Sequence, residues 1–248
     1  MAESLKPETI GKHFTLISGV LDDAIRDGII SSNPASLVKM PRAKEKFKGN
    51  TLTAGEAKTL LTAAKDAGEP IYTAILLPVV YGLRRSEVCG LRWQDIDFDN
   101  GVMHICNTVV KGDAGYIEEE RTKTRKSDRV IALVDFTVPH FKALKEQQQK
   151  AGLTLGKVCR WPNGDDIKHD YISKKFGKLL KENGLPPIRY HDLRHTAASL
   201  LIASGATPQQ TQEFLGHETV STTMNIYAHC LSDVKVKTAK LMNDIYFS

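Results

Sequence analysis

A histidine, an arginine and a second histidine recur at helical spacing in the segment His191-Asp192-Leu193-Arg194-His195. At about 100° per residue, these three side chains and that of Ala198 share one face of a helix predicted over residues 190–204. A histidine and an arginine three residues apart, beside a small alanine, are able to hold an anion. The same pattern is also typical of a solvated polar face, and this helix alone does not decide between the two interpretations.

A second group of candidate residues lies in the segment Gly82-Leu83-Arg84-Arg85-Ser86-Glu87. Arg84 and Arg85 stand at the start of a predicted helix, where a positive charge opposes the helix dipole. An arginine held there beside backbone N–H groups forms a strong phosphate site. The structural alternative is an ion pair between Arg84 and Glu87, three residues apart.

The third group is Leu215-Gly216-His217 followed, ten residues later, by Tyr227. Tyr227 shares an apolar helical stripe with Met224, Ala228 and Leu231, so a core tyrosine is its structural alternative. His217 is also suited to complement the end of a helix at Gly216. Each of these groups is weak evidence when taken alone.

Metal binding is a competing interpretation of the first group. His191, Asp192 and His195 form an HDxxH pattern that resembles the HExxH motif of zinc hydrolases, with His217 as a candidate third ligand. Aspartate is one methylene shorter than the glutamate that activates the zinc-bound water, so the match is imperfect. A DNA-binding helix-turn-helix regulator is a second alternative, since residues 197–204 and 208–215 have suitable lengths. The segment that would read the bases, Pro208–Leu215, contains no lysine or arginine.

Composition and charge limit the class of protein. The 248 residues carry 34 Lys and Arg against 29 Asp and Glu, a net charge of +5. Each of the segments Lys39–Lys48, Arg121–Val130 and Lys168–Lys181 holds five basic residues and one acidic residue. Such local surpluses are typical of proteins that bind a polyanion, although solvated faces also show them.

The longest apolar run, Ala74–Tyr81, has eight residues and is too short for a membrane helix, which needs about 18. The first 15 residues contain no signal-peptide pattern. The four cysteines are scattered without a CxxC pair, which favours a reducing cytoplasm.

Apolar periodicity predicts an amphipathic helix over residues 7–27, ended by Asn33-Pro34 and followed by a basic linker that ends at Lys48. We therefore expect two parts, a helical segment with linker over residues 1–48 and a main domain over residues 49–248. The main domain is predicted to be α+β and mostly α-helical, with a small three-stranded antiparallel sheet. The segment Thr53-Ala54-Gly55-Glu56 matches a capping box that opens a predicted helix, with Ala57, Leu60, Leu61 and Ala64 facing inward. The other predicted helices cover about 70–81, 86–93, 138–150, 168–183, 190–204, 208–215 and 222–230, with a tail helix from Ser232. The predicted strands cover 102–110, 116–122 and 129–134, with a turn at 97–101.

Taken together, the order and spacing of these groups resemble the tyrosine recombinase (phage integrase) family. The matching boxes are GLRRSE at 82–87, RTKT at 121–124, HDLRHT at 191–196, LGH at 215–217 and Tyr227 in TTMNIYAH. The resemblance covers residues 51–232, the family's catalytic domain. Residues 5–41 resemble the second half of the family's helical core-binding domain; the first half has no counterpart here, which suggests a truncated form.

The resemblance implies a site-specific DNA recombinase, an integrase of a phage or an integrative mobile element, that needs no metal, ATP or other cofactor. Tyr227 matches the nucleophile that forms a 3′-phosphotyrosine and leaves a free 5′-hydroxyl. The other matched site residues are Arg84 and Arg194, which grip the phosphate oxygens; Lys123, which protonates the departing 5′-oxygen; His191 and His217, which bond the phosphate or move protons; and Glu87, which orients the first arginine.

The implied partner is double-stranded DNA with attachment-type sites, bound by a monomer in solution that forms a homotetramer on DNA. Accessory DNA-bending or directionality proteins are expected, a membrane is not, and the place of action is the cytoplasm, at the nucleoid. The basic residues expected to contact DNA are Arg42, Lys44, Lys46, Lys48, Arg85, Arg121, Arg125, Lys126, Lys174 and Lys175.

Overall fold

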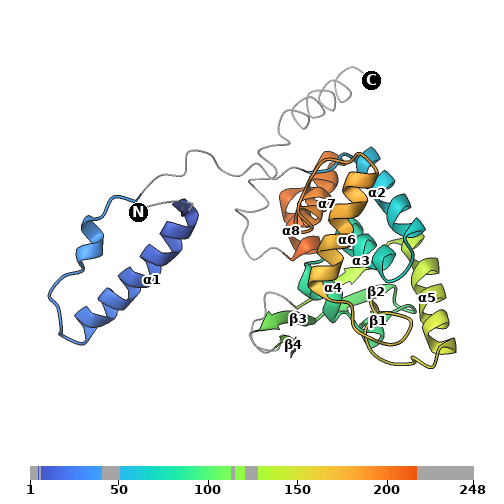
Figure 1. The fold of residues 1–248 in the computed structure, drawn as a ribbon, viewed down its shortest axis with the longest axis horizontal. Coiled ribbons are helices and arrows are strands. Elements are labelled where there is room, and N and C mark those ends of the chain that lie inside the picture. Colours follow the sequence, from blue (N-terminus) through green and yellow to red (C-terminus); the bar gives the residue numbers. More distant parts are fainter. Residues whose placement is uncertain (1–4, 6, 41–50, 113–114, 121–127, 217–248) are drawn as a thin grey trace, which may run out of the picture. The chain divides into compact units, whose positions relative to one another are not determined.

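The computed structural model describes residues 5, 7–40, 51–112, 115–120 and 128–216 (Figure 1). The chain divides into two compact units, Met1–Lys48 and Gly49–Ser248. Within the described residues, no helix is long and apolar enough to cross a membrane. The sequence predictions that lie outside the described residues concern Lys123, His217 and Tyr227, the basic residues Arg42, Lys44, Lys46, Lys48, Arg121, Arg125 and Lys126, and the helices after Gly216.

The first unit contains helix α1 (Pro7–Arg26) and a short 3₁₀ helix (Pro34–Leu37). Asn33 joins them, because its side-chain amide donates to the backbone oxygen of Ser18 at 3.2 Å and to Asp22 at 2.6 Å, while its Oδ1 caps the 3₁₀ helix. The predicted helix is confirmed. Within the described residues of this unit its apolar stripe is only partly covered, since Phe14 and Leu21 are half-buried and Ile17 is 57% exposed.

The core of the second unit forms around α3 (Ile71–Tyr81), an apolar helix that is buried along almost its whole length. Helices α2 (Ala54–Asp66) and α7 (Asp192–Ala203) pack against it, and α8 (Pro208–Leu215) packs on α7 (Figure 1). The predicted capping box of α2 is present, since the Thr53 hydroxyl accepts from the Glu56 amide and Glu56 accepts from the Thr53 amide at 2.7 Å.

The remaining helices are α4 (Arg85–Gly90), α5 (Val138–Lys150) and α6 (His169–Glu182), with 3₁₀ turns at Trp93–Asp95 and Asp135–Thr137. These agree with the prediction to within a few residues. The prediction was wrong at the end of α4, which stops at Gly90 rather than near Trp93. A Cβ at Gly90 would lie 2.6 Å from the Asn107 carbonyl oxygen, so this glycine allows strand β3 to approach the helix closely.

The strands form two sheets instead of the single sheet predicted. β1 (Ile96–Asp97), β2 (Val102–Ile105) and β5 (Arg129–Ala132) make a three-stranded antiparallel sheet in the order β1-β2-β5, and β3 (Asn107–Gly112) pairs with β4 (Gly115–Glu120) in a hairpin. The expected continuous strand over 102–110 is interrupted at Cys106. The Cys106 thiol and the Asn107 side chain bond Asp95, and β3 lies on α4, which together draw the chain away from β2. The fold class, mostly helical with a small antiparallel sheet, is confirmed.

Candidate active site

Three arginine side chains from separate elements converge on the end of α8. Arg84 precedes α4, Arg194 lies in α7 and Arg129 begins β5. The carbonyl oxygen of Gly216, the residue that ends α8, accepts from Arg84 Nη2 at 3.3 Å and from Arg194 Nη2 at 3.1 Å. Arg194 Nη1 also donates to the Gly82 carbonyl at 2.7 Å. The arginine cluster, defined here as Arg84, Arg129 and Arg194, therefore joins residues more than 100 positions apart in the sequence.

Two glycines make this convergence possible. Gly82 and Gly216 both have left-handed backbones, with φ of 65° and 67°. A Cβ on Gly82 would lie 2.1 Å from Leu215 Cδ2, and one on Gly216 would lie 2.5 Å from Arg129 Cδ. Any other residue would thus combine an unfavourable backbone conformation with a collision, and both turns direct a carbonyl oxygen toward Arg194.

Glu87 is the carboxylate at the centre of the cluster and is fully buried. It accepts from the backbone N–H and Nη1 of Arg84, both at 2.8 Å, and from the two Nη groups of Arg129 at 3.2 and 3.1 Å. Burial by itself would raise the pKa of Glu87, but Arg129 and Arg84 outweigh that effect and lower the pKa to about 2. The residue is therefore an anion at neutral pH, and it fixes both guanidinium groups.

The charge of this arrangement is unbalanced. Two guanidinium groups, those of Arg84 and Arg129, pair with the one carboxylate of Glu87, and among the described residues the buried Nε of Arg129 has no hydrogen-bond partner. Arg194 is only 2% exposed, so the interpretation of its helix face as a solvated polar surface is wrong at that position. Two paired cations to one anion, with a further arginine nearby, are suited to an anionic ligand.

Arg129 is a site residue that sequence reasoning missed. The sequence indicated only that it begins a strand and belongs to the basic segment Arg121–Val130. A buried carboxylate at position 87 requires cationic partners, yet nothing in the local pattern marks a residue 42 positions away as one of them. The signal that was available is indirect, since Glu87 directly precedes the apolar residues Val88 and Cys89 on a short helix.

The two histidines of the HDLRH segment lie beside the cluster. His191 directly precedes α7, and its ring meets that of His195 edge to face, with 5.3 Å between the ring centres. Burial lowers the pKa of His191, with further lowering from His195 and Arg194, and burial also lowers the pKa of His195. Both rings are therefore neutral at pH 7. Among the described residues, no group of three or more potential metal ligands is found.

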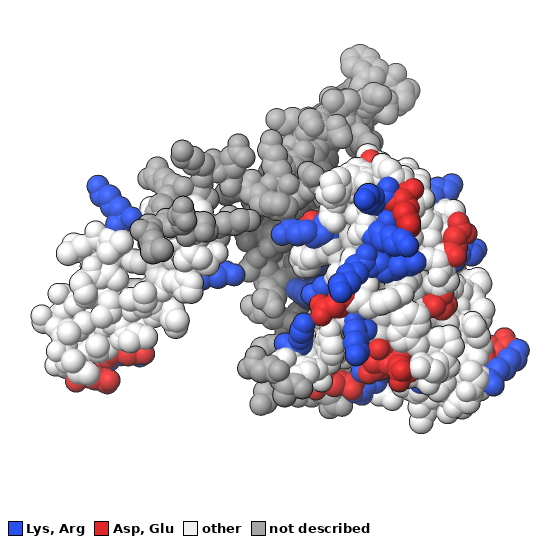
Figure 2. Space-filling view, viewed as in Figure 1, with Lys and Arg blue, Asp and Glu red and all other residues white. Residues whose placement is uncertain are grey.

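A hollow of about 540 Å³ adjoins the cluster and is rich in basic and hydroxyl groups. Those lining it are Arg84, Arg85, Ser86, His169, Ser173, Arg189 and His191. Arg85 Nη1 donates to Ser173 Oγ at 2.6 Å, which ties the start of α4 to α6. Lys174 and Lys175 follow on α6, and Figure 2 shows lysine and arginine side chains gathered over the region that α6 occupies in Figure 1.

The predicted site residues therefore divide into three groups. Arg84, Glu87 and Arg194 are in mutual contact or share Gly216, and His191 lines the same hollow as Arg84. Arg85, Lys174 and Lys175 lie along that hollow or on the adjoining helix. The remaining predicted residues lie outside the part of the chain that the structure describes.

The chain belongs to the phage integrase family, whose profile matches residues 50–233. It is 28% identical to a XerC-like tyrosine recombinase of Caldanaerobacter subterraneus subsp. tengcongensis, over 90% of this chain and 62% of the relative. It is 26% identical to the ICEBs1 integrase of Bacillus subtilis, over 99% of this chain and 68% of the relative. The chain thus spans about two thirds of the length of these relatives.

Solved structures share the fold. The Tn1549 transposon integrase in complex with transposon right end DNA is 24% identical, with a TM-score of 0.79 over 96% of this chain and 81% of that one. A lambda integrase tetramer bound to a Holliday junction is 20% identical, with a TM-score of 0.57 over 86% of this chain and 57% of that one. The comparisons give no support to the zinc hydrolase or to the helix-turn-helix regulator.

Proposed function

We propose that this chain is the catalytic part of a site-specific DNA recombinase that acts through a phosphotyrosine intermediate formed by Tyr227. The observation that carries the proposal is the arginine cluster, in which two buried or half-buried arginines share the Gly216 carbonyl while Glu87 and Arg129 fix their surroundings. Membership of the phage integrase family supports the same reaction.

The proposed reaction balances without a cofactor. The Tyr227 hydroxyl gives up its proton to water, its oxygen attacks the scissile phosphorus, the bond from phosphorus to the 5′-oxygen breaks, and that oxygen takes a proton from Lys123. A 5′-hydroxyl from a partner strand then reverses these steps and releases Tyr227. The energy of the phosphodiester bond is kept in the tyrosyl ester, so no ATP is consumed.

The largest free-energy cost in this reaction is the ionisation of Tyr227. A tyrosine with a pKa of about 10 is about one-thousandth ionised at pH 7, which corresponds to about 4 kcal/mol. Preorganised donors aimed at the developing charge of a transition state contribute about 3–4 kcal/mol each. Arg84 and Arg194 together therefore offset the ionisation of the nucleophile. We assign His191 and His217 to hydrogen bonds with the phosphate, and His191, being neutral at pH 7, would contribute direction more than charge.

The flanking DNA backbone is proposed to follow the hollow beside Arg84. Arg85, Lys174 and Lys175 lie along this path, and Arg42, Lys44, Lys46, Lys48, Arg121, Arg125 and Lys126 are proposed as further phosphate contacts. Such contacts release counterions, so binding weakens steeply with salt. We further propose that residues 1–48 act as part of a core-binding segment, and that a monomer assembles into a homotetramer on two duplexes. Action at the cytoplasmic nucleoid and the involvement of accessory DNA-bending or directionality proteins remain predictions.

A covalent trap tests the proposed function. The protein is incubated in EDTA with a pool of nicked duplexes of random central sequence, which lose a short 5′-hydroxyl fragment after cleavage. Wild type is expected to form a DNA adduct that survives SDS, whereas Tyr227→Phe forms none. Sequencing the trapped DNA then yields the preferred site. Absence of an adduct from folded protein that binds the pool, both alone and joined to the N-terminal part of a relative, would contradict the proposal.

A further inference from the structure

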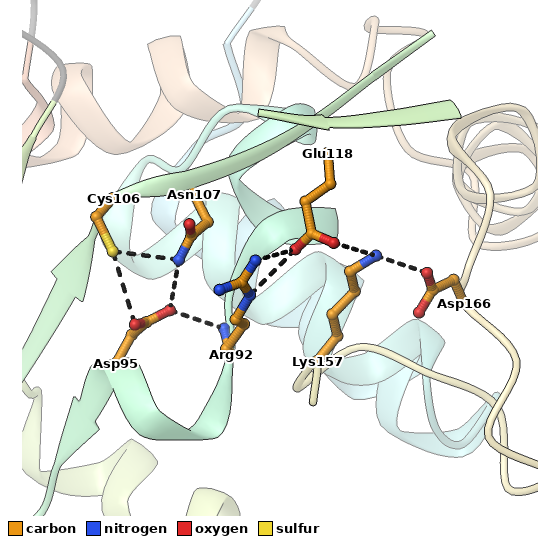
Figure 3. Close-up of polar contacts among 7 residues, drawn as sticks. All are labelled: Arg92, Asp95, Cys106, Asn107, Glu118, Lys157 and Asp166. Carbon is orange, nitrogen blue, oxygen red and sulfur yellow. Dashed lines mark hydrogen bonds and ion pairs between the residues drawn. The ribbon is translucent and has the colours of Figure 1, made fainter. Parts of the chain in front are cut away.

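The β3–β4 hairpin is tied to the body of its unit by a chain of ion pairs (Figure 3). Arg92 donates from Nε and Nη2 to Glu118 Oε1 at 3.0 and 2.6 Å, and Glu118 belongs to β4. Lys157 Nζ lies 3.8 Å from Glu118 Oε2 and 2.5 Å from Asp166 Oδ2. These four residues, here called the hairpin clamp, have alternating charges that sum to zero.

The two cations of the clamp are held side by side by backbone pairing. Arg92 and Lys157 form an isolated antiparallel bridge, in which Val158 N–H donates to Leu91 O at 2.9 Å and Trp93 N–H donates to Gly156 O at 3.1 Å. Arg92 lies two residues past the end of α4, so the clamp connects β4 to the helix that starts directly after Arg84.

On this side β4 borders a hollow, and Tyr116 of β4 meets the ring of His169 edge to face, with 5.1 Å between the ring centres. A hollow of about 710 Å³ lies against the hairpin, lined in part by Val109, Tyr116 and Trp161. Glu118 and Lys157 also line this hollow, so the ion pair between them forms part of its wall. A two-stranded hairpin is marginally stable by itself. Among the described residues, its other polar ties include one at the base, where Asn107 Nδ2 donates to Asp95 at 3.1 Å, one near the tip, where Lys111 meets Asp170 at 3.0 Å, and a hydrogen bond between His169 and the Val109 backbone.

The hairpin clamp holds the strand that directly precedes the Lys123 segment in the sequence. β4 ends at Glu120 and β5 begins at Arg129, and Lys123 lies in the sequence between them. On the far side of Lys123, Arg129 pairs with Glu87 of α4. On the near side, Glu118 pairs with Arg92. Both flanks of the Lys123 segment are thus fixed to one short helix and its immediate neighbour.

We propose that Glu118 is a positioning residue that, through Arg92 and Lys157, sets the strand leading to Lys123 relative to Arg84. This inference rests on the proposed function, in which Lys123 protonates the 5′-oxygen. A displacement of about 1 Å in a reacting group lowers a rate by as much as about 100-fold. Loosening β4 is therefore expected to slow protonation of the leaving group and to leave phosphate binding unchanged.

Single-turnover cleavage with two leaving groups tests the role of Glu118. The duplex recovered from the covalent trap is prepared with either oxygen or sulfur at the scissile 5′ position. A thiol has a pKa of about 8.5, so its thiolate departs without an acid. Glu118→Gln is expected to slow cleavage about tenfold on the oxygen substrate and less than twofold on the sulfur substrate. Lys123→Ala should show the same pattern with a larger defect on oxygen.

Glu119→Gln is the matched control, because it removes the same charge from the next residue of β4, whose side chain is exposed. It is expected to cleave both substrates at the wild-type rate. Amide hydrogen exchange without DNA provides a second readout, in which residues 115–120 exchange faster in Glu118→Gln than in Glu119→Gln or wild type. Equal slowing on oxygen and sulfur, or unchanged exchange, would overturn the inference. Lack of cleavage by wild type would instead overturn the proposed function and, with it, this role.

Discussion

The arginine cluster and the hairpin clamp both fix cationic side chains through a glutamate, but they do so in opposite surroundings. Glu87 is fully buried, whereas the Glu118 side chain is 38% exposed and borders a hollow. Removing one partner of a buried pair leaves an uncompensated charge and destabilises a protein by about 3–5 kcal/mol. A pair near the surface contributes about 0.2–1 kcal/mol. The comparison predicts that the arginine cluster is inseparable from folding, whereas the hairpin can be altered without unfolding the chain.

Replacement of Glu87 should have the largest effect. Glu87→Gln keeps the shape but removes the charge that Arg84 and Arg129 share, so we expect a loss of about 3–5 kcal/mol in urea unfolding at pH 7. In wild type, the pKa of Glu87 is lowered from 4.5 to about 2. Its stabilising contribution is therefore complete above about pH 4.5 and is lost as the pH falls toward 2.

The Gln variant should lack that part of the acid sensitivity. If Glu87→Gln keeps the wild-type free energy of unfolding at pH 7, the arginine cluster does not depend on this carboxylate. The expected difference in stability contribution between Glu87 and Glu118 would then be absent.

A substitution of Arg194 should mainly lower the rate of covalent adduct formation. Arg194→Lys keeps the positive charge but has no second Nη group to span the Gly82 and Gly216 carbonyls. We expect covalent adduct formation to fall about 100-fold. Arg160→Lys is the control, since Arg160 is also buried and bonds Gln148 and two backbone oxygens away from the cluster. If both variants retain wild-type cleavage, Arg194 has no part in the reaction.

A substitution at Gly216 tests the geometry of the arginine cluster without changing its charge. Gly216→Ala leaves every charge in place but puts a methyl group against Arg129 and strains a left-handed backbone. Gly184→Ala carries similar strain, with φ of 63°, and its new methyl group meets nothing within 4 Å. Strain alone is about 1–2 kcal/mol. Thermal unfolding should show a larger loss for Gly216→Ala, and equal losses would mean that the contact with Arg129 is easily relieved.

The smallest expected effect is the coupling within the hairpin clamp. A double-mutant cycle with Arg92→Ala and Glu118→Gln should give an interaction energy of about 0.5–1 kcal/mol in urea unfolding, and this energy should decrease in high salt. An interaction energy of about 3–5 kcal/mol, as large as the loss expected for Glu87→Gln, would mean that the partly exposed Arg92–Glu118 pair stabilises the protein as much as the buried Glu87 does.

The sequence was sufficient for those features that depend on local patterns. The capping box at Thr53, the start of α8 at Thr207-Pro208, its end at Gly216 and the limits of α5 all follow from short-range rules. The family boxes identified Arg84, Glu87 and Arg194 as candidates, and the structure brings these three together. Their roles in the reaction stay predictions until the covalent trap is done.

Features that depend on long-range packing were missed. The division of the strands into two sheets follows from the close approach of β3 to Gly90 and from the bonds of Asp95 to Cys106 and Asn107. Neither contact leaves a periodic signal in the sequence. Arg129 was overlooked for a similar reason, because its partner Glu87 is 42 positions away and nothing distinguishes Arg129 from the other basic residues of the segment Arg121–Val130.

The hollow against the hairpin has a practical consequence, because one of the two tryptophans of the chain lines it. Trp161 is half-buried beside Tyr171, whereas Trp93 is 3% exposed and donates to Gln148. A Trp93→Phe variant would therefore carry a single tryptophan, which lies beside the hairpin and can be excited selectively over the tyrosines. Its emission and its quenching by iodide would then report movement of β4 in real time, without any attached dye.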